Sequence, residues 1–323
     1  MNDVEMPALT GDSPLGILAA IGVLRLLSDF TDDDPRLRWD PRSFTAVLST
    51  SRTDVSGIVD ALQRIVSTIP RGAVLPGVVP GFPPEGGTKD GMRVPQVDLR
   101  TKCAEWFSGA RESDSWEGLR WVASLVTDLA VDNKKDNRVA ISRFTAPSGQ
   151  QKMISMLKKP LEAIQKDPNY LRQALLRWQR VSGVTGEYLD HRAMWSAAED
   201  GSGVTGSMRG VPGATWLALM SYPLFRTTIS PRGERLSSGW HAASQGGYEL
   251  RLPVWVQPIG PAAVTALIEH PALTTRKKQE DRGRNELSGS APQLAALGIV
   301  HVCRARRDQS SDSNSAGVLV TVT

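Results

Sequence analysis

The segment that decides the fold is residues 13–27, which read SPLGILAAIGVLRLL. Ser13 is a residue type that caps helices, and Pro14 suits the first helical position, where a missing N–H costs no hydrogen bond. The apolar residues that follow are spread around every side of the helix, and a helix that is apolar all round is buried. Gly16 and Gly22 lower its helix propensity and indicate close packing against a neighbour. We therefore predict a central core helix that ends at the acidic residues 32–34.

Shorter elements are expected on both sides of this helix. Apolar residues at helical spacing predict amphipathic or buried helices over 54–69, 116–131, 149–178 (interrupted at Pro160 and Pro168) and 214–225. Apolar or alternating runs predict strands at 37–39, 44–48, 139–144, 248–256, 299–305 and 318–322. Residues 71–95 hold six glycines and five prolines, a density that predicts a long, mobile surface loop.

These elements predict an α+β fold, with mixed helices, short and mostly antiparallel sheets, and a long loop rich in glycine and proline. A chain of 323 residues is long for one compact core, so two lobes are expected. We place an N-terminal α+β lobe at residues 1–145 and a helical, then β-rich lobe at residues 146–323.

The composition excludes several classes of protein. Hydrophobic residues make up 40% of the chain and charged residues 22%, as in an ordinary globular protein, which excludes a mainly disordered chain, a coiled coil and a collagen-like repeat. Two cysteines, Cys103 and Cys303, are too few for a disulfide framework or a four-cysteine zinc site. We expect both to be packing residues.

Motifs of catalysis and nucleotide binding are absent from the sequence. It contains no G-x-S-x-G, no G-x-x-x-x-G-K-[ST], and no G-x-G-x-x-G between a strand and a helix. Asp190 and His191, close to Glu187, could form part of a metal or acid–base site, although without a second cluster of ligands a polar helix start is the favoured explanation. We therefore expect a protein that is not an enzyme and that needs no cofactor or metal, and keep an enzyme with a site near Asp190 and His191 as an alternative.

The charge distribution permits a nucleic-acid partner. The net charge is +4 at a pI near 9.2, and it rises along the chain from −3 over residues 1–100 to +2 over 101–200 and +5 over 201–323. Basic residues bracket the strand expected at 139–144, follow on the next helix and form a dense run near residue 277. A distributed phosphate-contacting surface would use such residues. The candidate nucleic-acid-binding residues are Lys134, Lys135, Arg138, Arg143, Gln151, Lys152, Lys158, Lys159, Arg276, Lys277 and Lys278.

Three segments resemble proteins encoded at CRISPR type I-G (formerly I-U) loci. Residues 13–27, with Arg38 and Trp39, resemble the proline-led apolar helix and tryptophan-bearing strand that open those proteins. Residues 147–151 (PSGQQ) resemble a segment that opens a mid-chain helix, and residues 210–219 (GVPGATWLAL) resemble a late helix. The resemblance covers these segments only. It points either to the shorter family of Cascade large subunits or to the family that extends the helicase-nuclease.

The resemblance implies a non-catalytic, DNA- and RNA-binding subunit of a crRNA-guided ribonucleoprotein complex for antiviral defence. Its expected partners are crRNA, target DNA, other effector subunits and the helicase-nuclease. Such a subunit leaves sequence reading to base pairing and needs basic surfaces rather than catalytic residues. The alternative is a protein-only scaffold that links the effector to its helicase-nuclease.

We expect a cytoplasmic protein with no membrane partner. Asp3, Glu5 and Asp12 precede the first apolar run, where a secretion signal would carry basic residues. That run spans only the 14 residues from Pro14 to Leu27, whereas a bilayer-spanning helix needs about 20.

Overall fold

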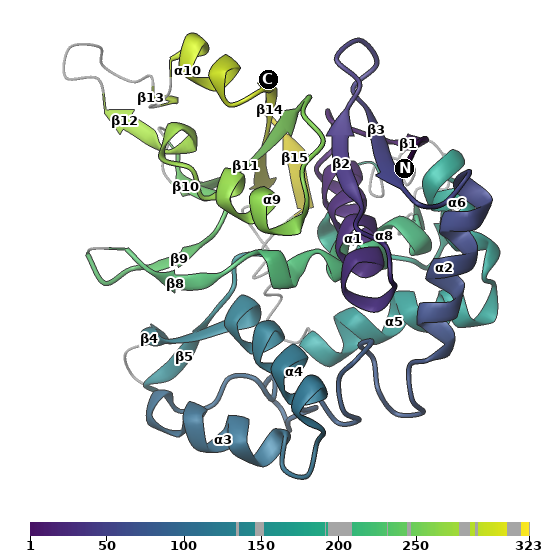
Figure 1. Cartoon of the computed structure of the whole chain (residues 1–323). Helices are drawn as coiled ribbons and strands as arrows, with labels where there is room; N and C mark the ends of the chain where they lie inside the picture. The colour runs from purple at the N-terminus through teal and green to yellow at the C-terminus, as the bar shows by residue number, and fades with distance from the viewer. Residues whose placement is uncertain are drawn as a thin grey trace, which may run out of the picture.

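The computed structural model describes residues 1–133, 136–145, 152–190, 192, 209–230, 232–243, 247–277, 285–287, 290–308 and 318–322. Helices alternate with several short antiparallel sheets (Figure 1), which confirms the predicted α+β class.

The N-terminal elements form one supersecondary unit. In chain order they are β1 (Asn2–Thr10), α1 (Pro14–Phe30), β2 (Arg36–Trp39), β3 (Thr45–Thr50) and α2 (Val55–Ser67). The sheet order is β1-β3-β2, and β3 is antiparallel to both neighbours. The strands β1 and β2 are therefore parallel to each other with β3 between them, which is the split βαβ arrangement of ferredoxin-like units. The predicted strands at 37–39 and 44–48 and the helix over 54–69 are confirmed, whereas β1 was not predicted.

The predicted central helix is α1, and its predicted cap is confirmed. The side chain of Ser13 accepts a hydrogen bond from the Gly16 N–H at 3.3 Å, and every residue from Pro14 to Leu27 is buried. A Cβ added to Gly22 would lie 1.8 Å from the carbonyl oxygen of Leu217 in α8 (Pro212–Met220). The glycine thus lets the backbones of two buried helices touch.

The loop over residues 71–95 contains no helix or strand, as predicted, and leads into η1 (Gln96–Asp98) and α3 (Leu99–Trp106). Its predicted surface position holds only for part of the loop, where residues 71–72, 80–81 and 85–89 are exposed. Leu75, Phe82 and Met92 are at most 1% exposed and belong to the hydrophobic core. Because these apolar side chains lie between the glycines and prolines, the loop is anchored to the core along its length.

The helix predicted over 116–131 is α4 (Glu112–Leu125), which ends earlier than expected. From Val126 the chain forms β4 (Val126–Asn133), which pairs with β5 (Arg138–Ile141). Leu129 shared the helical spacing in the sequence but is 57% exposed on β4. Pairing with β5, a long-range feature, decides the end of the helix.

Pro160 does not interrupt the next helix, contrary to the prediction. It lies buried inside α5 (Met153–Lys166), which packs against α8. The predicted break at Pro168 is confirmed, because α6 (Asn169–Leu176) begins just after it. Met153, Leu157, Leu161 and Ile164 are buried as expected from their spacing. Ile154, expected in the core with them, is only partly buried and packs against it. Short elements follow: β6 (Val181–Ser182), η2 (Gly186–Tyr188) and β7 (Arg209–Gly210).

The C-terminal part is β-rich, as predicted. A sheet of order β10-β11-β14-β15 contains β10 (Trp240–Ala242), β11 (Tyr248–Trp255), β14 (Ile299–Asp308) and β15 (Val318–Thr321). Around it lie η3 (Tyr222–Leu224), the hairpin of β8 (Thr227–Ile229) and β9 (Arg235–Ser237), α9 (Pro261–Ile268), η4 (Pro271–Leu273), the hairpin of β12 (Thr275–Lys277) and β13 (Asn285–Leu287), and α10 (Ala291–Ala296).

One hydrophobic core contains residues from both sides of position 145. At the contact between the two main sheets, the indole N–H of Trp255 donates to the Leu37 carbonyl oxygen at 2.7 Å. Leu37 and Ile259 exchange backbone hydrogen bonds of 2.9 and 3.1 Å. The division into lobes at residue 145 stays a prediction.

Within the described ranges, no helix has both the length and the apolar character that a bilayer crossing requires.

Candidate nucleic-acid interface

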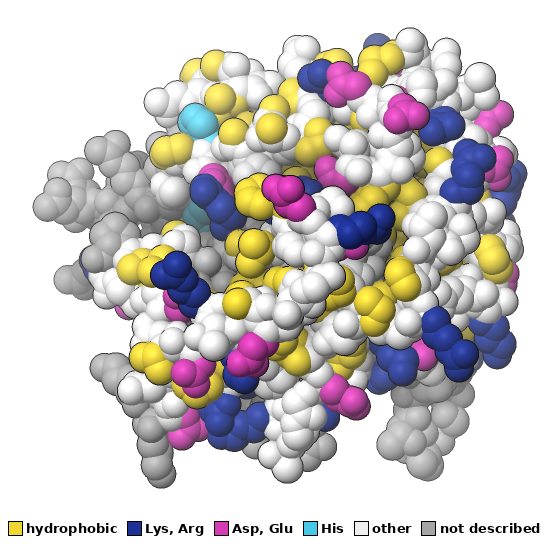
Figure 2. All heavy atoms as spheres, turned by 60° about the horizontal axis from the view of Figure 1, so that its bottom comes forward, with side chains coloured by type: hydrophobic (Ala, Val, Ile, Leu, Met, Phe, Trp, Pro, Cys, Tyr) yellow, Lys and Arg dark blue, Asp and Glu magenta, His cyan; other side chains and the backbone are white. Residues whose placement is uncertain are grey.

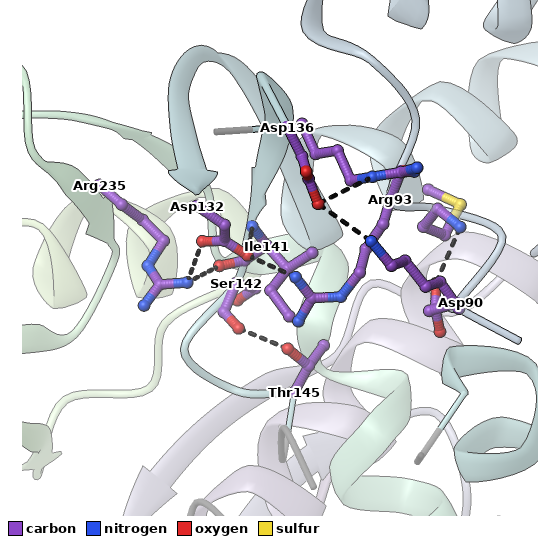
Figure 3. A network of polar contacts seen from close by, with 11 residues as sticks. Asp90, Arg93, Asp132, Asp136, Ile141, Ser142, Thr145 and Arg235 are labelled. Carbon is purple, nitrogen blue, oxygen red and sulfur yellow. Dashed lines mark hydrogen bonds and ion pairs between the residues drawn. The ribbon is translucent and has the colours of Figure 1, made fainter. Parts of the chain in front are cut away.

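The hairpin of β4 and β5 carries a network of ion pairs (Figure 3). Asp132 accepts hydrogen bonds from the guanidinium groups of Arg93, at 3.0 Å, and Arg235, at 2.7 Å. Lys89 forms an ion pair with Asp136 at 3.0 Å. The network ties residues 89–93 of the long loop to the hairpin and to β9.

Arg138, a predicted phosphate ligand, belongs to this network. Its guanidinium donates to the Arg93 carbonyl oxygen, and its Nε lies 3.9 Å from a carboxylate oxygen of Asp136. The side chain is half-buried. Arg138 therefore serves mainly to hold the loop against β5.

Arg143, a second predicted ligand, is also engaged inside the protein. Its guanidinium carbon lies 3.1 Å from the centroid of the Tyr248 ring, and its backbone N–H donates to Ser237 Oγ at 3.1 Å. Burial, and then the neighbouring charge of Arg235, lower the pKa of Arg143 to about 10. The group remains a cation at neutral pH but is packed as a cation–π contact.

Lys152 lies at the N-cap position of α5 and is half-buried. Its Nζ donates to the Gly86 carbonyl oxygen at 3.3 Å. Asp90 accepts the backbone N–H groups of Met153 and, at 2.8 Å, Met92, so the loop provides the missing cap of the helix. Burial raises the pKa of Asp90, although these hydrogen bonds oppose the shift.

Lys158 and Lys159 are exposed on the outer side of α5. Lys158 forms an ion pair with Glu162, one helical turn away, at 3.6 Å. Lys159 makes no ion pair with any other described residue. Of the two, Lys159 is thus better placed to meet an external phosphate.

The structure does not bring all the predicted residues together. Arg276 and Lys277 lie in β12, opposite Glu286 and Asn285 of β13, and β12 lies across the molecule from α5 in Figure 1. The remaining predicted residues lie outside the described part of the chain: Lys134, Lys135, Gln151 and Lys278.

A basic surface of which the sequence indicated only Lys159 lies on α2, α5 and α6. These helices contact one another, and Gln63 of α2 donates to the Pro168 carbonyl oxygen at 3.5 Å. On these helices and at the C-cap of α6, the exposed cations without an ion pair to another described residue are Arg64, Lys159, Lys166, Arg172 and Arg177, which we call the outer helical surface. Lys and Arg side chains gather on the right of Figure 2, the side on which these helices lie. The seven-residue spacing of Lys159 and Lys166 could have indicated this surface from the sequence, because residues seven apart lie on nearly the same side of a helix.

Acidic side chains lie among the basic ones over the face shown in Figure 2, its right side included. Many of the half-buried arginines already hold a carboxylate, as Arg93 and Arg235 do with Asp132. The outer helical surface therefore offers more cations that are available for phosphate contacts than the β4–β5 hairpin does.

Of the alternative catalytic pair, the structure describes only Asp190. Asp190 is buried and forms an ion pair with Arg180 at 2.7 Å, and it also accepts the Arg192 N–H at 3.0 Å. His191 lies outside the described residues. Among the residues that the structure does describe, no three His, Cys, Asp or Glu side chains are grouped so that they could hold a metal ion.

Both cysteines are held as neutral thiols. Burial raises the pKa of Cys103 to about 11 and that of Cys303 to about 12. A thiolate is the nucleophilic form, so neither side chain is activated at neutral pH.

A scan against models of protein families matches no family, and a search of curated proteins finds no match.

Proposed function

We propose that this chain is a non-catalytic subunit of a crRNA-guided type I CRISPR effector complex, in which it contacts nucleic acid. Two features support the proposal. The segment that resembles type I-G proteins, residues 13–27, is the central helix α1, so the resemblance concerns the core of the fold. The outer helical surface presents cations to the outside on three neighbouring helices.

The observation that carries the nucleic-acid part of the proposal is the lack of internal ion pairs for Lys159 and Lys166 within the described residues. They lie seven residues apart on α5, so they project from nearly the same side of the helix. These exposed cations have no ion pair to break before they bind a phosphate. When they contact the phosphates of a nucleic acid, the counterions condensed on that nucleic acid are released, which favours binding.

The test uses the chain assembled with crRNA and the other effector subunits. In the double variant Lys159→Glu and Lys166→Glu, affinity for target DNA should fall. The slope of the logarithm of the binding constant against the logarithm of the salt concentration should become less steep by about 0.7–0.9 per lost phosphate contact. The matched control is Arg100→Glu with Lys102→Glu on α3, which changes the charge equally on another element. Equal affinities and salt slopes for both double variants and wild type would refute the proposal.

A protein-only scaffold is the second candidate. The exposed Trp116 on α4 favours it, because tryptophan is enriched at the centres of protein interfaces. A complex that assembles only with this chain, and whose DNA affinity is unaffected by either double variant, would support the scaffold.

A further inference from the structure

Three arginines surround one carboxylate on the sheet that contains β11 and β14. In β11, Glu249 lies opposite Arg306 of β14. Two residues further along β11, Arg251 lies opposite Arg304. Because residues two apart and residues directly opposite point to the same side of a sheet, the four side chains share one face. We call these four residues the β11–β14 cluster.

The cluster carries more positive than negative charge. The Glu249 carboxylate forms ion pairs with all three guanidinium groups, at 2.9 Å (Arg251), 2.8 Å (Arg304) and 3.2 Å (Arg306). Three cations against one carboxylate leave a net charge of +2. A charge that is partly removed from water is unfavourable unless a counter-charge accompanies it, so the cluster favours the approach of an anion.

The cluster has an inner and an outer half. Glu249 and Arg251 are at most 1% exposed, and the Arg251 guanidinium also donates to the Leu273 carbonyl oxygen at 2.9 Å. The side chains of Arg304 and Arg306 are 35% and 24% exposed. The two arginines of β14 therefore form the part of the cluster that an external group can reach.

Arg304 keeps hydrogen-bond donors for an external acceptor. Its Nε and Nη2 donate to the two carboxylate oxygens of Glu249, at 2.8 and 3.0 Å. A guanidinium group has five N–H donors, so this contact leaves three, two of them on Nη1. The Nη1 atom donates to no described residue and is not buried. An anion can therefore bind Arg304 without breaking its pair with Glu249.

The pair with Glu249 also fixes the direction of these donors. A contact through two parallel hydrogen bonds holds the plane of the guanidinium group, and the carboxylate that holds it is buried in the sheet. An incoming anion therefore meets a side chain that has already lost most of its rotamer freedom, which lowers the entropic cost of binding.

We propose that the β11–β14 cluster is a second phosphate-contacting site for nucleic acid, in which Arg304 and Arg306 bind the phosphodiester backbone. The planar guanidinium fork matches the oxygens of a phosphate group. The two arginines are two residues apart on β14, about 6.6 Å along the strand, so they form a short row, as backbone phosphates do. The inference rests on the proposed function in one respect, because it takes the ligand to be nucleic acid.

This site is separate from the outer helical surface. In Figure 1, β14 lies at the top of the molecule, whereas α2, α5 and α6 lie on the right. Arg307, the next residue of β14, does not belong to the site, because it donates to the Phe144 carbonyl oxygen at 2.9 Å on the other face of the sheet. The two surfaces share no residue, so variants can test them independently.

The test adds a carboxylate beside the cluster and leaves all four of its members in place. Val320 of β15 is half-buried and lies directly opposite Arg306, so the new side chain in Val320→Glu would compete with a phosphate for the cluster. Binding of a fluorescent 20-nucleotide oligothymidylate to the full chain is measured across a salt series. Affinity at low salt should fall by about threefold or more, and the slope of the logarithm of the binding constant against the logarithm of the salt concentration should become less steep by about 0.7 per lost phosphate contact.

Val300→Glu is the matched control, because it makes the same change of charge on β14. Val300 is 47% exposed and lies four residues from Arg304, about 13 Å along the strand, where salt screens most of the interaction. It should leave affinity and salt slope nearly unchanged. Arg304→Gln removes the outward donors and should lower affinity as Val320→Glu does. Melting temperatures of all variants show whether each is folded.

The proposal is overturned if the wild-type chain does not bind the oligonucleotide at low salt, or if Val320→Glu and Arg304→Gln bind it as Val300→Glu does. Displacement by polyglutamate as readily as by unlabelled oligothymidylate would also overturn it, and would indicate an acidic protein partner. The double variant Lys159→Glu with Lys166→Glu, measured in parallel, separates this inference from the proposed function. Loss of affinity in that variant but not in Val320→Glu would leave the outer helical surface and remove the β11–β14 cluster, and the reverse result would do the opposite.

Discussion

Arg25 of α1 and Glu117 of α4 form a buried ion pair, although 92 residues separate them in the chain. The side chain of Arg25 is fully buried, and its Nη1 also donates to the Met220 carbonyl oxygen of α8 at 2.8 Å. One guanidinium group thus links three helices. Because an isolated charge in a core is strongly unfavourable, the position of α4 depends on this pair.

The first prediction follows from that pair. Glu117→Leu leaves the buried Arg25 with Asp29, 3.1 Å from its Nε, as its remaining described counter-charge, and the free energy of unfolding should fall by about 3 kcal/mol. Chemical denaturation checks the value. Arg111→Leu removes the exposed ion pair to Asp114 on the same helix and should cost at most about 1 kcal/mol. Similar losses of stability in Glu117→Leu and Arg111→Leu would show that the buried ion pair of Arg25 contributes no more than the exposed one.

The second prediction concerns the contact between α1 and α8. In Gly22→Ala the new Cβ would lie 1.8 Å from the Leu217 carbonyl oxygen, so the helices must separate. The protein should lose about 3 kcal/mol of stability or more, or fail to fold. Gly87→Ala is the control, because a Cβ there meets no atom within 4 Å and its φ angle is not positive. Thermal melts with equal midpoints for Gly22→Ala and Gly87→Ala would disprove the close approach of the α1 and α8 backbones.

The third prediction concerns Glu249, which is fully buried between the guanidinium groups of Arg251, Arg304 and Arg306. Desolvation opposes ionisation, but hydrogen bonds from Arg304 and Arg251 outweigh it and lower the pKa of Glu249 to about 2. A carboxyl group with a lowered folded-state pKa stabilises the protein above its unfolded pKa and loses that contribution as the pH falls. The free energy of unfolding should therefore decrease from about pH 5 towards pH 2.

Glu249→Gln should remove this pH-dependent contribution, which is on the order of 3 kcal/mol. Urea denaturation at a series of pH values measures the slope for both proteins. The wild type should show the steeper slope between pH 5 and pH 2, and parallel curves would contradict the assignment. Additional loss of stability at neutral pH is expected because the buried guanidinium groups lose the negative charge between them, and an amide NH2 replaces one of the two acceptor oxygens.

Much of the fold could be predicted because its signals are local. The Ser13 cap, the helix apolar on all sides and the alternating strands near residues 250 and 302 each depend on neighbours in the sequence. The strand β1 was missed although Val4 and Met6 alternate with the exposed Asp3 and Glu5, which is the pattern of a half-buried strand. Pro7 ends that alternation after a few residues. Pro160 was expected to break a helix, but burial against α8 stabilises α5 through it.

The candidate site was predicted less well, because a cation's availability depends on long-range pairing. In the sequence Arg138, Lys152 and Lys159 look equally basic. The folded chain engages Arg138 with Arg93 and Asp136, and Lys152 with Gly86, while Lys159 remains exposed. Residues 86–93 and 132–138 are distant in sequence, so no local pattern could have shown which basic side chains they occupy.

The last prediction concerns tryptic cleavage in the long loop. The glycine and proline content suggested easy cleavage after Arg71, Lys89 or Arg93, but the structure makes these sites unequal. Arg71 is exposed and makes no ion pair with another described residue, whereas Arg93 is held by Asp132 at 3.0 Å and by its own N–H to the Asp90 carbonyl oxygen at 3.1 Å. Proteases cut segments that open locally, and each contact raises the free energy of opening. Cleavage after Arg71 should therefore be fastest of the three, and Asp132→Asn should accelerate cleavage after Arg93 without changing the rate at Arg71.

Mass spectrometry of a trypsin time course resolves each site. Wild-type cleavage at Arg93 as fast as at Arg71, or a uniform acceleration of both sites in Asp132→Asn, would show that the ion-pair network does not anchor the loop.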